Sequence, residues 1–309
     1  MVHSEAFSAH VPVFTHMVRT ENQRAWLRDL PRLVSEFERR WGVTTSEPFR
    51  SGTSAWVAPG VTQDGREAVL KIVWPHPEAA GEAAGLRHWA GRGAAELYAS
   101  DTEHFALLLE RCSPGTALST AGLRPEEALA EGAQVLHRLW SAVPHWDVGL
   151  ESITDVAEKW CLEAEERYRE FRPSFDRALV GKGLGLLRSL PLSATRNVVV
   201  HGDFNPGNIV RANREPWLAI DAKPAVGDPG IDPEPLVAQV DYPFARSNPA
   251  AVLRQRYALV ADIVGEPAER LIAWALARTV HSALWSAAHG QDGLDDMSDA
   301  TVLAGLLGI

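Results

Sequence analysis

The sequence predicts an α+β protein with two lobes: a small N-terminal lobe with a five-stranded antiparallel sheet, and a larger, mainly helical C-terminal lobe. Two observations support this prediction. Short apolar runs separated by turns fill the chain between Phe49 and Glu110, which is typical of strands. From Arg124 onwards, apolar residues recur at intervals of three and four, the period of amphipathic helices. The turn-rich interval Ser113–Gly115 separates the two patterns.

The small lobe begins with a predicted helix. Apolar residues spaced three and four apart cover Glu21–Trp41, and Pro31 could kink or divide this helix. Gln63–Arg66 has the composition of a hairpin turn. The segment Phe49–Val57 precedes this turn. The apolar runs that predict strands after it are Ala68–Trp74, Ala94–Tyr98 and Phe105–Glu110.

The large lobe is predicted to hold several long helices. A first helix starts at Pro125, a residue that favours the first helical turn. Further helices are expected over Ile153–Phe171, Ala178–Leu190 and much of Val252–Ile309, with Trp274 and Trp285 in the core. We therefore divide the chain into an N-terminal lobe of residues 1–112 and a C-terminal lobe of residues 113–309.

The amino-acid composition favours a globular protein and disfavours a nucleic-acid-binding or membrane protein. The 309 residues are 46% hydrophobic and 23% charged, ordinary values for a globular protein. The formal net charge of −10 disfavours a nucleic acid partner, which would need clustered Lys and Arg. We expect no membrane segment and no signal peptide. The two cysteines, Cys112 and Cys161, suit a reducing compartment, so a cytoplasmic protein is expected.

One stretch, Val198–Asp221, carries the polar residues of a reaction centre. The runs Val198–Val200 and Trp217–Ile220 read as two short strands. The loop between them holds Asp203 and, five residues later, Asn208. The spacing H-x-D-x-x-x-x-N, followed by an aspartate at a strand end, is that of a kinase catalytic loop and its metal-binding aspartate. Each residue alone could be a turn former, but the complete set favours Mg-dependent phosphoryl transfer.

The wording of this stretch resembles a known family. The segment HGDFNPGN is similar to the catalytic loop of aminoglycoside phosphotransferases, and REPWLAIDAKPAVGDPGIDPEPLV resembles the streptomycin 6-kinase and hydroxyurea-resistance kinase branch. The resemblance implies a protein-kinase-like fold that binds ATP and Mg²⁺ between the lobes. It implies that Asp203 is the base, and that Asn208 and Asp221 hold the metal. Asp228 resembles a second, structural acid of the family.

The small lobe offers candidates for nucleotide binding. Lys71, in a strand of apolar neighbours, resembles the kinase lysine that meets the phosphates and pairs with a helix glutamate. Glu82 is the expected partner, and Glu78 is the alternative. Ser51, Gly52 and Thr53 occupy the place of a phosphate-covering loop, although they could equally form a plain hairpin loop. In kinase-like folds Glu110 and Cys112 would form the hinge, where their backbone groups bond the adenine edge.

The resemblance and the acidic charge together imply a cationic, aminoglycoside-like acceptor. Carboxylates of the C-terminal lobe should then line its pocket, although each could instead be a solvated surface acid. The candidates are Asp232, Glu234, Asp241, Asp292, Asp295 and Asp296. The small-molecule acceptor and the nucleotide are the expected partners, and a monomer or weak dimer is the expected assembly.

Other functions stay open at this stage. A kinase of the same fold could act on hydroxyurea, an aminosugar, choline or a biosynthetic intermediate. A nucleotide-binding protein without catalysis would show the loss of the base or of a metal ligand, and none of these residues is missing from the sequence.

Overall fold

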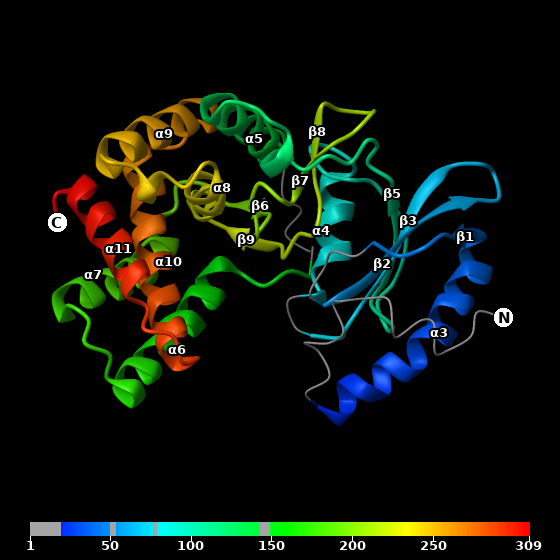
Figure 1. Cartoon of the computed structure of the whole chain (residues 1–309), viewed down its shortest axis with the longest axis horizontal. Coiled ribbons are helices and arrows are strands. Elements are labelled where there is room, and N and C mark those ends of the chain that lie inside the picture. Colours follow the sequence, from blue (N-terminus) through cyan, green and yellow to red (C-terminus); the bar gives the residue numbers. More distant parts are fainter. Residues whose placement is uncertain (1–19, 50–53, 77–78, 143–148) are drawn as a thin grey trace.

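The computed structural model describes residues 20–49, 54–76, 79–142 and 149–309. It shows a small sheet-containing lobe on the right of Figure 1 and a larger helical lobe on the left, which confirms the predicted fold class. Within the described residues, no helix is long and apolar enough to cross a membrane.

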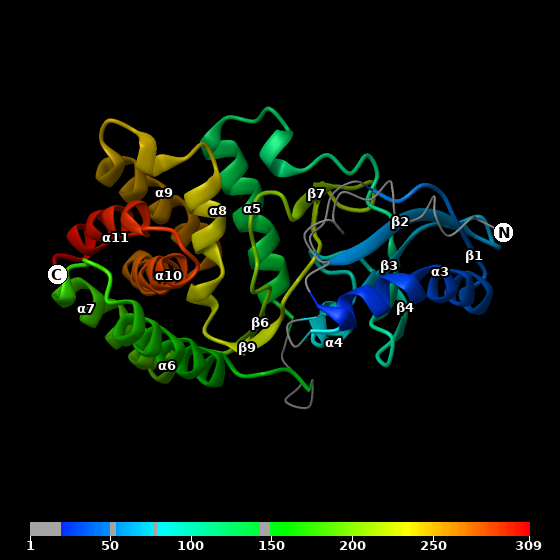
Figure 2. The same ribbon diagram turned by 60° about the horizontal axis from the view of Figure 1, so that its bottom comes forward.

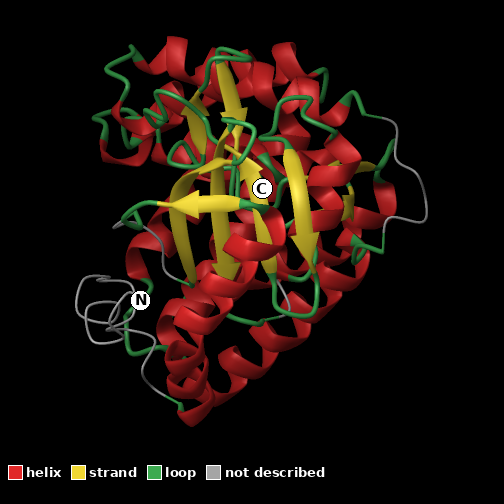
Figure 3. Ribbon diagram, turned by 90° about the vertical axis from the view of Figure 1, so that its right-hand side faces the viewer, coloured by secondary structure: helices red, strands yellow, loops and turns green. Residues whose placement is uncertain are grey.

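The sheet of the small lobe has the strand order β1-β2-β3-β5-β4, with every neighbouring pair antiparallel. Its strands face the viewer in Figure 3. A hairpin at residues 63–66 joins β2 to β3, as predicted. The strand bounds are β1 Val43–Thr45, β2 Ala55–Thr62, β3 Glu67–Val73, β4 Leu97–Asp101 and β5 Ala106–Glu110.

The strands of the small lobe differ from the sequence-based prediction in two respects. The run expected over Ala94–Tyr98 becomes a strand only from Leu97, because Ala94 instead forms a parallel bridge with Ala219 of the large lobe. The three-residue strand β1 was not predicted, since it follows the preceding helix directly after Gly42. Both differences arise from pairing with residues distant in sequence, which local pattern does not encode.

Helix α3, Glu21–Trp41, covers one face of this sheet (Figure 2). Thr20 and Gln23 form a capping box at its start, and Gly42 ends it in the left-handed conformation. Pro31 lies inside the helix without dividing it. The inner stripe, which includes Leu30 and Phe37, packs against Trp56, Leu70 and Ile72 of the sheet.

In the part of the large lobe that the structure describes, there are seven α-helices. Their bounds are α5 Pro125–Trp140, α6 Ile153–Phe171, α7 Arg177–Ser189, α8 Pro233–Gln239, α9 Pro249–Val264, α10 Ala268–Ala288 and α11 Leu294–Leu307. Helix α10 runs through the lobe, and Trp274 at its centre is fully buried. The expectation that Trp285 is also core was wrong: it is 45% exposed, because it lies near the end of α10, where it stacks on His289.

The large lobe also contains two short antiparallel ribbons. Strand β6, Val198–Val200, pairs with β9, Ala225–Gly227, and strand β7, Ile209–Arg211, pairs with β8, Trp217–Ala219. The ribbon β7–β8 also reaches the small lobe, because Ala219 exchanges backbone hydrogen bonds with Gly93 and Ala95. The loops between these strands therefore lie where the lobes meet.

Arg214, at the tip of the β7–β8 ribbon, fastens this contact. Its guanidinium donates to the Glu110 carboxylate at 2.8 Å and to the backbone oxygens of Gly91 and Ala94 at 2.6 and 2.8 Å. Glu110 is largely buried, with 11% of its side chain exposed. Charge-assisted hydrogen bonds of this kind are the stronger ones in proteins.

We expect Arg214→Met to lower the free energy of unfolding by about 1–3 kcal/mol, because Glu110 would keep its buried charge without its partner. Urea titration of both proteins measures the difference. Arg124→Met is the matched control, since Arg124 pairs with Glu127 on the exposed start of α5 and should cost less than about 1 kcal/mol. Equal losses for the two variants would contradict this role of Arg214.

Candidate active site

The loop between β6 and β7 covers residues 201–208, and the side chain of its first residue, His201, stabilises its backbone. This residue is fully buried. Its Nε2 lies 3.0 Å from the carbonyl oxygen of Ile220, while its Nδ1 faces the backbone N–H of Asp203 at 3.3 Å. These partners assign a neutral ring with the proton on Nε2. Burial lowers the pKa of His201 below its usual value despite the nearby carboxylates of Asp232 and Asp203, so the ring is a structural support.

Asp232 supports the same loop from the start of α8. Its oxygens accept the backbone N–H groups of His201 at 2.7 Å and Gly202 at 2.8 Å, and Trp140 Nε1 adds a third hydrogen bond at 3.3 Å. Asp232 is 1% exposed, and burial raises its pKa. A carboxylate engaged in this way has no surface to offer a dissolved substrate. The expected substrate contact of Asp232 therefore gives way to a structural role.

Asp203 is oriented by a residue that the sequence analysis did not single out. Asn205 Nδ2 donates to Asp203 Oδ1 at 3.1 Å, and Asn205 Oδ1 accepts the N–H groups of Gly207 and Asn208. The amide of Asn205 thus holds both the carboxylate and the turn that follows it. The asparagine two positions after the loop aspartate was the available signal, but Asn is also a common turn former.

The side-chain amide of Asn208 bonds back to the catalytic loop through its nitrogen. Its Nδ2 donates to the carbonyl oxygen of Asp203 at 3.0 Å, which assigns the nitrogen to the protein side and leaves Oδ1 as an acceptor. An amide oxygen and a carboxylate are ligands that suit Mg²⁺. The orientation of Asn208 therefore fits the metal role expected from the sequence.

Asp221 follows β8 in the left-handed conformation, with φ of 59°. Few residues other than glycine adopt this region, although aspartate does so more readily than most. Its side chain is 58% exposed, and its Oδ1 lies 2.6 Å from Lys71 Nζ. Although the side chain is exposed on one side, the protein around the carboxyl removes part of its hydration, which acts to raise the pKa of Asp221; the charge and hydrogen bond of Lys71 outweigh this effect and lower the pKa. Asp221 is thus held as a carboxylate facing the space between the lobes.

Lys71 of β3 pairs with Glu82, the first residue of helix α4, Glu82–Trp89. Lys71 Nζ lies 2.7 Å from both Glu82 oxygens, and both side chains are more than nine-tenths buried. Burial acts to lower the pKa of Lys71, but Glu82 and Asp221 outweigh it and raise this pKa. The three acceptors use all three N–H groups of the ammonium. The alternative partner, Glu78, lies outside the described residues.

For the other candidate nucleotide-binding residues, the described part of the chain shows no contact that tests their role. Ser51, Gly52 and Thr53 lie outside the described residues. Glu110 ends β5; its backbone N–H donates to Glu96, and its carboxylate is bound by Arg214. Cys112 follows it, with a thiol whose pKa burial raises to about 12. The hinge role of Glu110 and Cys112 stays a prediction, as does the lobe boundary at Ser113.

The acids of the large lobe that were candidates for substrate binding lie on different elements and have different partners. Asp241 forms an ion pair with Arg246, and Glu234 lies 3.6 Å from Arg278. Asp295 and Asp296 share the first turn of α11, where Asp296 accepts a hydrogen bond from Ser286. Asp228 is buried and binds Arg270 at 2.5 Å and Trp274 Nε1 at 2.5 Å, in keeping with a structural acid.

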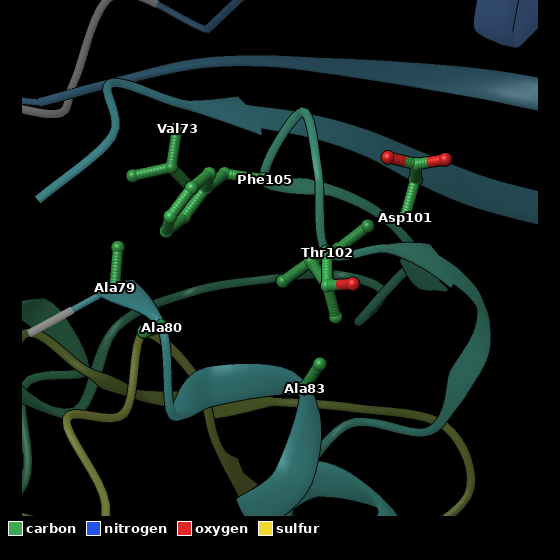
Figure 4. A pocket seen from close by; sticks show the side chains of 8 residues that line it. Val73, Ala79, Ala80, Ala83, Asp101, Thr102 and Phe105 are labelled. Atoms are coloured by element: carbon green, nitrogen blue, oxygen red, sulfur yellow. The ribbon is translucent and has the colours of Figure 1, made fainter. Parts of the chain in front are cut away.

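A cavity of about 80 Å³ lies between α4 and the strands of the small lobe (Figure 4). Its lining is mostly apolar and includes Val73, Ala83 and Phe105. Pockets that hold drug-sized ligands measure about 300–1,000 Å³. This cavity is therefore too small for the nucleotide or for an antibiotic, and the helix that carries Glu82 forms part of its wall through Ala83.

The arrangement defines a class of enzyme. A small sheet lobe presents a buried Lys–Glu pair, a helical lobe presents the Asp203 loop, and Asp221 links the two, which together define a kinase of the protein-kinase-like fold. The chain matches, over residues 40–290, the family described as aminoglycoside/hydroxyurea antibiotic resistance kinase. It belongs to this family and is a phosphotransferase with a hydroxyl acceptor.

Individual relatives agree with this assignment. Streptomycin 6-kinase of Streptomyces glaucescens is 32% identical over 277 residues, which cover 89% of each chain. Hydroxyurea phosphotransferase of Kitasatospora aureofaciens is 34% identical over 291 residues, covering 92% of this chain and 82% of the relative. A solved structure of a spectinomycin phosphotransferase with ADP and spectinomycin superposes with a TM-score of 0.55 at 13% identity, covering 89% of this chain and 93% of that one.

Proposed function

We propose that this kinase transfers the γ-phosphoryl group of ATP to a hydroxyl group of a cationic, streptomycin-type antibiotic, and that the transfer depends on Mg²⁺. The observation that carries the proposal is the contact of Lys71 with both Glu82 and Asp221. In the proposal Lys71 binds the phosphates and Asp221 binds the metal, and this contact between the two side chains supports those roles. The family membership and the ADP complex of the spectinomycin enzyme support ATP as the donor.

In this mechanism the protein supplies position and charge. Asp203 accepts a hydrogen bond from the acceptor hydroxyl and takes its proton during transfer. Lys71, kept charged by Glu82, neutralises the phosphates. Asn208 Oδ1 and the Asp221 carboxylate would hold Mg²⁺, which when bound neutralises charge on the phosphate oxygens. Asp232, His201 and Asn205 keep the loop in the conformation that makes this possible.

A second acceptor class has specific support, because the hydroxyurea phosphotransferase is as similar to this chain as the streptomycin kinase is. Hydroxyurea is small and uncharged, whereas streptomycin is a polycation. The acids Asp295 and Asp296 favour the cation, since they lie together in the first turn of α11, where Asp295 is exposed and Asp296 is half-buried. Their part in acceptor binding is included in the proposal.

The proposal is tested first by ligand-induced thermal shift. ATP should raise the melting temperature more with Mg²⁺ than without it, because a ligand of the native state stabilises that state. Antibiotics and hydroxyurea are then added in turn, and ATP consumption is measured with each compound that shifts the melting temperature. Absence of any Mg-dependent shift with ATP would refute the nucleotide and metal parts of the proposal.

Ionic strength separates the two acceptor classes. If a polycation binds beside Asp295 and Asp296, salt screens the attraction, so the KM for streptomycin should rise with salt while the KM for ATP changes less. The double variant Asp295→Asn/Asp296→Asn should raise the KM for streptomycin by about 3- to 10-fold at low salt and flatten its salt dependence.

The matched control is Asp262→Asn/Glu269→Gln, which removes the same charge from exposed positions on α9 and α10. It should leave the KM for streptomycin close to that of the unaltered enzyme. If both double variants raise this KM equally, general charge rather than a pocket at α11 is responsible.

A further inference from the structure

Lys223 lies two residues after Asp221 and makes a contact that the mechanism above does not use. Its Nζ is 3.5 Å from Asp203 Oδ2. The same charge also reaches the metal-binding acid, because Lys223 is one of the groups, after Lys71 and His201, that lower the pKa of Asp221 against the effect of burial. The ammonium of Lys223 therefore acts electrostatically on both Asp203 and Asp221.

The backbone of Lys223 is fixed against the catalytic loop. Its N–H donates to the carbonyl oxygen of His201 at 2.8 Å. A Cβ on Gly202 would stand 2.0 Å from the Lys223 carbonyl oxygen, and Gly202 has φ of +80°, so only glycine allows this close approach. The side chain of Lys223, 45% exposed, thus extends into the site from a backbone that the loop itself positions.

Phosphoryl transfer in this site would develop negative charge between Asp203 and Asp221, where a cation would stabilise it. Asp203 marks the position of the acceptor hydroxyl and Asp221 that of the nucleotide phosphates, so the phosphoryl group travels between them. Its transition state spreads negative charge over three equatorial oxygens. Lys71, which the proposed mechanism assigns to the nucleotide phosphates, lies against Glu82 and Asp221 on the nucleotide side. The ammonium of Lys223 lies 3.5 Å from Asp203 Oδ2, beside the path that the phosphoryl group would take.

We propose that Lys223 is a catalytic residue that contacts the phosphoryl group during transfer. The inference rests on the proposed function. The acceptor oxygen forms a bond to the γ-phosphorus, the bond from that phosphorus to the β–γ bridging oxygen breaks, and ADP leaves with the electron pair. The acceptor proton passes to Asp203. Lys223 forms no covalent bond; its ammonium moves from Asp203 Oδ2 to an equatorial phosphoryl oxygen as the acceptor hydroxyl takes its place.

A purely positioning role is the rival. In that case Lys223 would only hold the Asp203 carboxylate, as Asn205 does from the other oxygen. The two roles differ in what they do to a mimic of the planar phosphoryl group. Fluoroaluminate bound with Mg–ADP carries charge where the phosphoryl oxygens lie, so a cation that contacts those oxygens should stabilise this complex.

The test compares Lys223→Met, Lys223→Arg and the control Lys182→Met, an exposed lysine on α7. The melting temperature of each protein is measured alone, with Mg–ADP, and with Mg–ADP plus aluminium fluoride. The rate of ATP hydrolysis without acceptor is measured alongside. The ligand-free melting temperature shows whether each variant is folded, and Lys223→Arg, which keeps a cation in place, provides a milder change.

We expect Lys223→Met to keep the shift caused by Mg–ADP but to lose the additional shift caused by fluoroaluminate. Its hydrolysis rate should fall about 100-fold, whereas Lys182→Met should match the unaltered enzyme and Lys223→Arg should recover part of both signals. If Lys223→Met keeps the fluoroaluminate shift, the residue only positions Asp203 and the inference is wrong. If the unaltered enzyme shows no Mg–ADP shift at all, the proposed function fails and the inference with it.

Discussion

Asp203→Asn should lower kcat by about 10²- to 10⁴-fold, the range typical of a lost general base. Asparagine can keep the hydrogen bond from Asn205 to Oδ1, so the loop should retain its shape. It cannot accept the acceptor proton, and it gives up the charge that faces Lys223. The affinity for ATP should change little, because the proposal assigns Asp203 to the acceptor hydroxyl and not to the nucleotide. Steady-state kinetics and a nucleotide titration measure the two quantities separately.

The control for Asp203→Asn is Asp262→Asn, which makes the same chemical change on the exposed face of α9. It should leave both kcat and the affinity for ATP unaltered. A kcat for Asp203→Asn within a few-fold of the unaltered enzyme would mean that another group, or none, accepts the proton. A large loss of ATP affinity would instead place Asp203 on the nucleotide.

Asp221→Asn should have the second large effect, and on a different quantity. Mg²⁺ would lose a charged oxygen ligand, and Lys71 Nζ would lose the carboxylate that lies 2.6 Å away. We expect the affinity for ATP in the presence of Mg²⁺ to fall by more than about 10-fold. The affinity for ATP measured in EDTA should change far less, because that state does not use the metal ligand.

Titrations of ATP with and without Mg²⁺, for both proteins, give the four values needed. The metal role predicts that the gain from Mg²⁺ is large in the unaltered enzyme and small in Asp221→Asn. If Mg²⁺ gives both proteins the same gain, Asp221 is not a ligand, and its contact with Lys71 serves only to join the lobes.

Much of the fold could be predicted because local pattern and tertiary structure agree. The helices Glu21–Trp41 and Ile153–Phe171 and the strand Val198–Val200 have the predicted bounds. Each combines a clear period or a β-branched run with a recognisable start, such as the capping box at Thr20. The predictions were wrong where contacts between residues distant in sequence determine the structure. Ala94 pairs with Ala219 across the lobes, and the exposure of Trp285 depends on where α10 leaves the core.

The site shows the same division. The spacing of Asp203, Asn208 and Asp221 could be read from the chain, because all three lie in one continuous segment: the loop after β6, the β7–β8 ribbon and the residues that follow it. Asp232 could not be assigned, since its sequence position does not reveal that it lies under His201 and Gly202. Lys223 was passed over for a related reason: its nearness to Asp203 arises from the fold of two loops, which Gly202 permits.

The central claim is that this enzyme moves a phosphoryl group from ATP to the hydroxyl of a cationic antibiotic with Asp203 as the base. Intact-mass measurement of streptomycin and of hydroxyurea, each incubated with ATP, Mg²⁺ and enzyme, tests it most directly. We predict that streptomycin gains the mass of one phosphoryl group with the unaltered enzyme and with Asp262→Asn, and gains it at a greatly reduced rate with Asp203→Asn. A gain by hydroxyurea alone, or a gain that proceeds equally fast with Asp203→Asn, would contradict the claim.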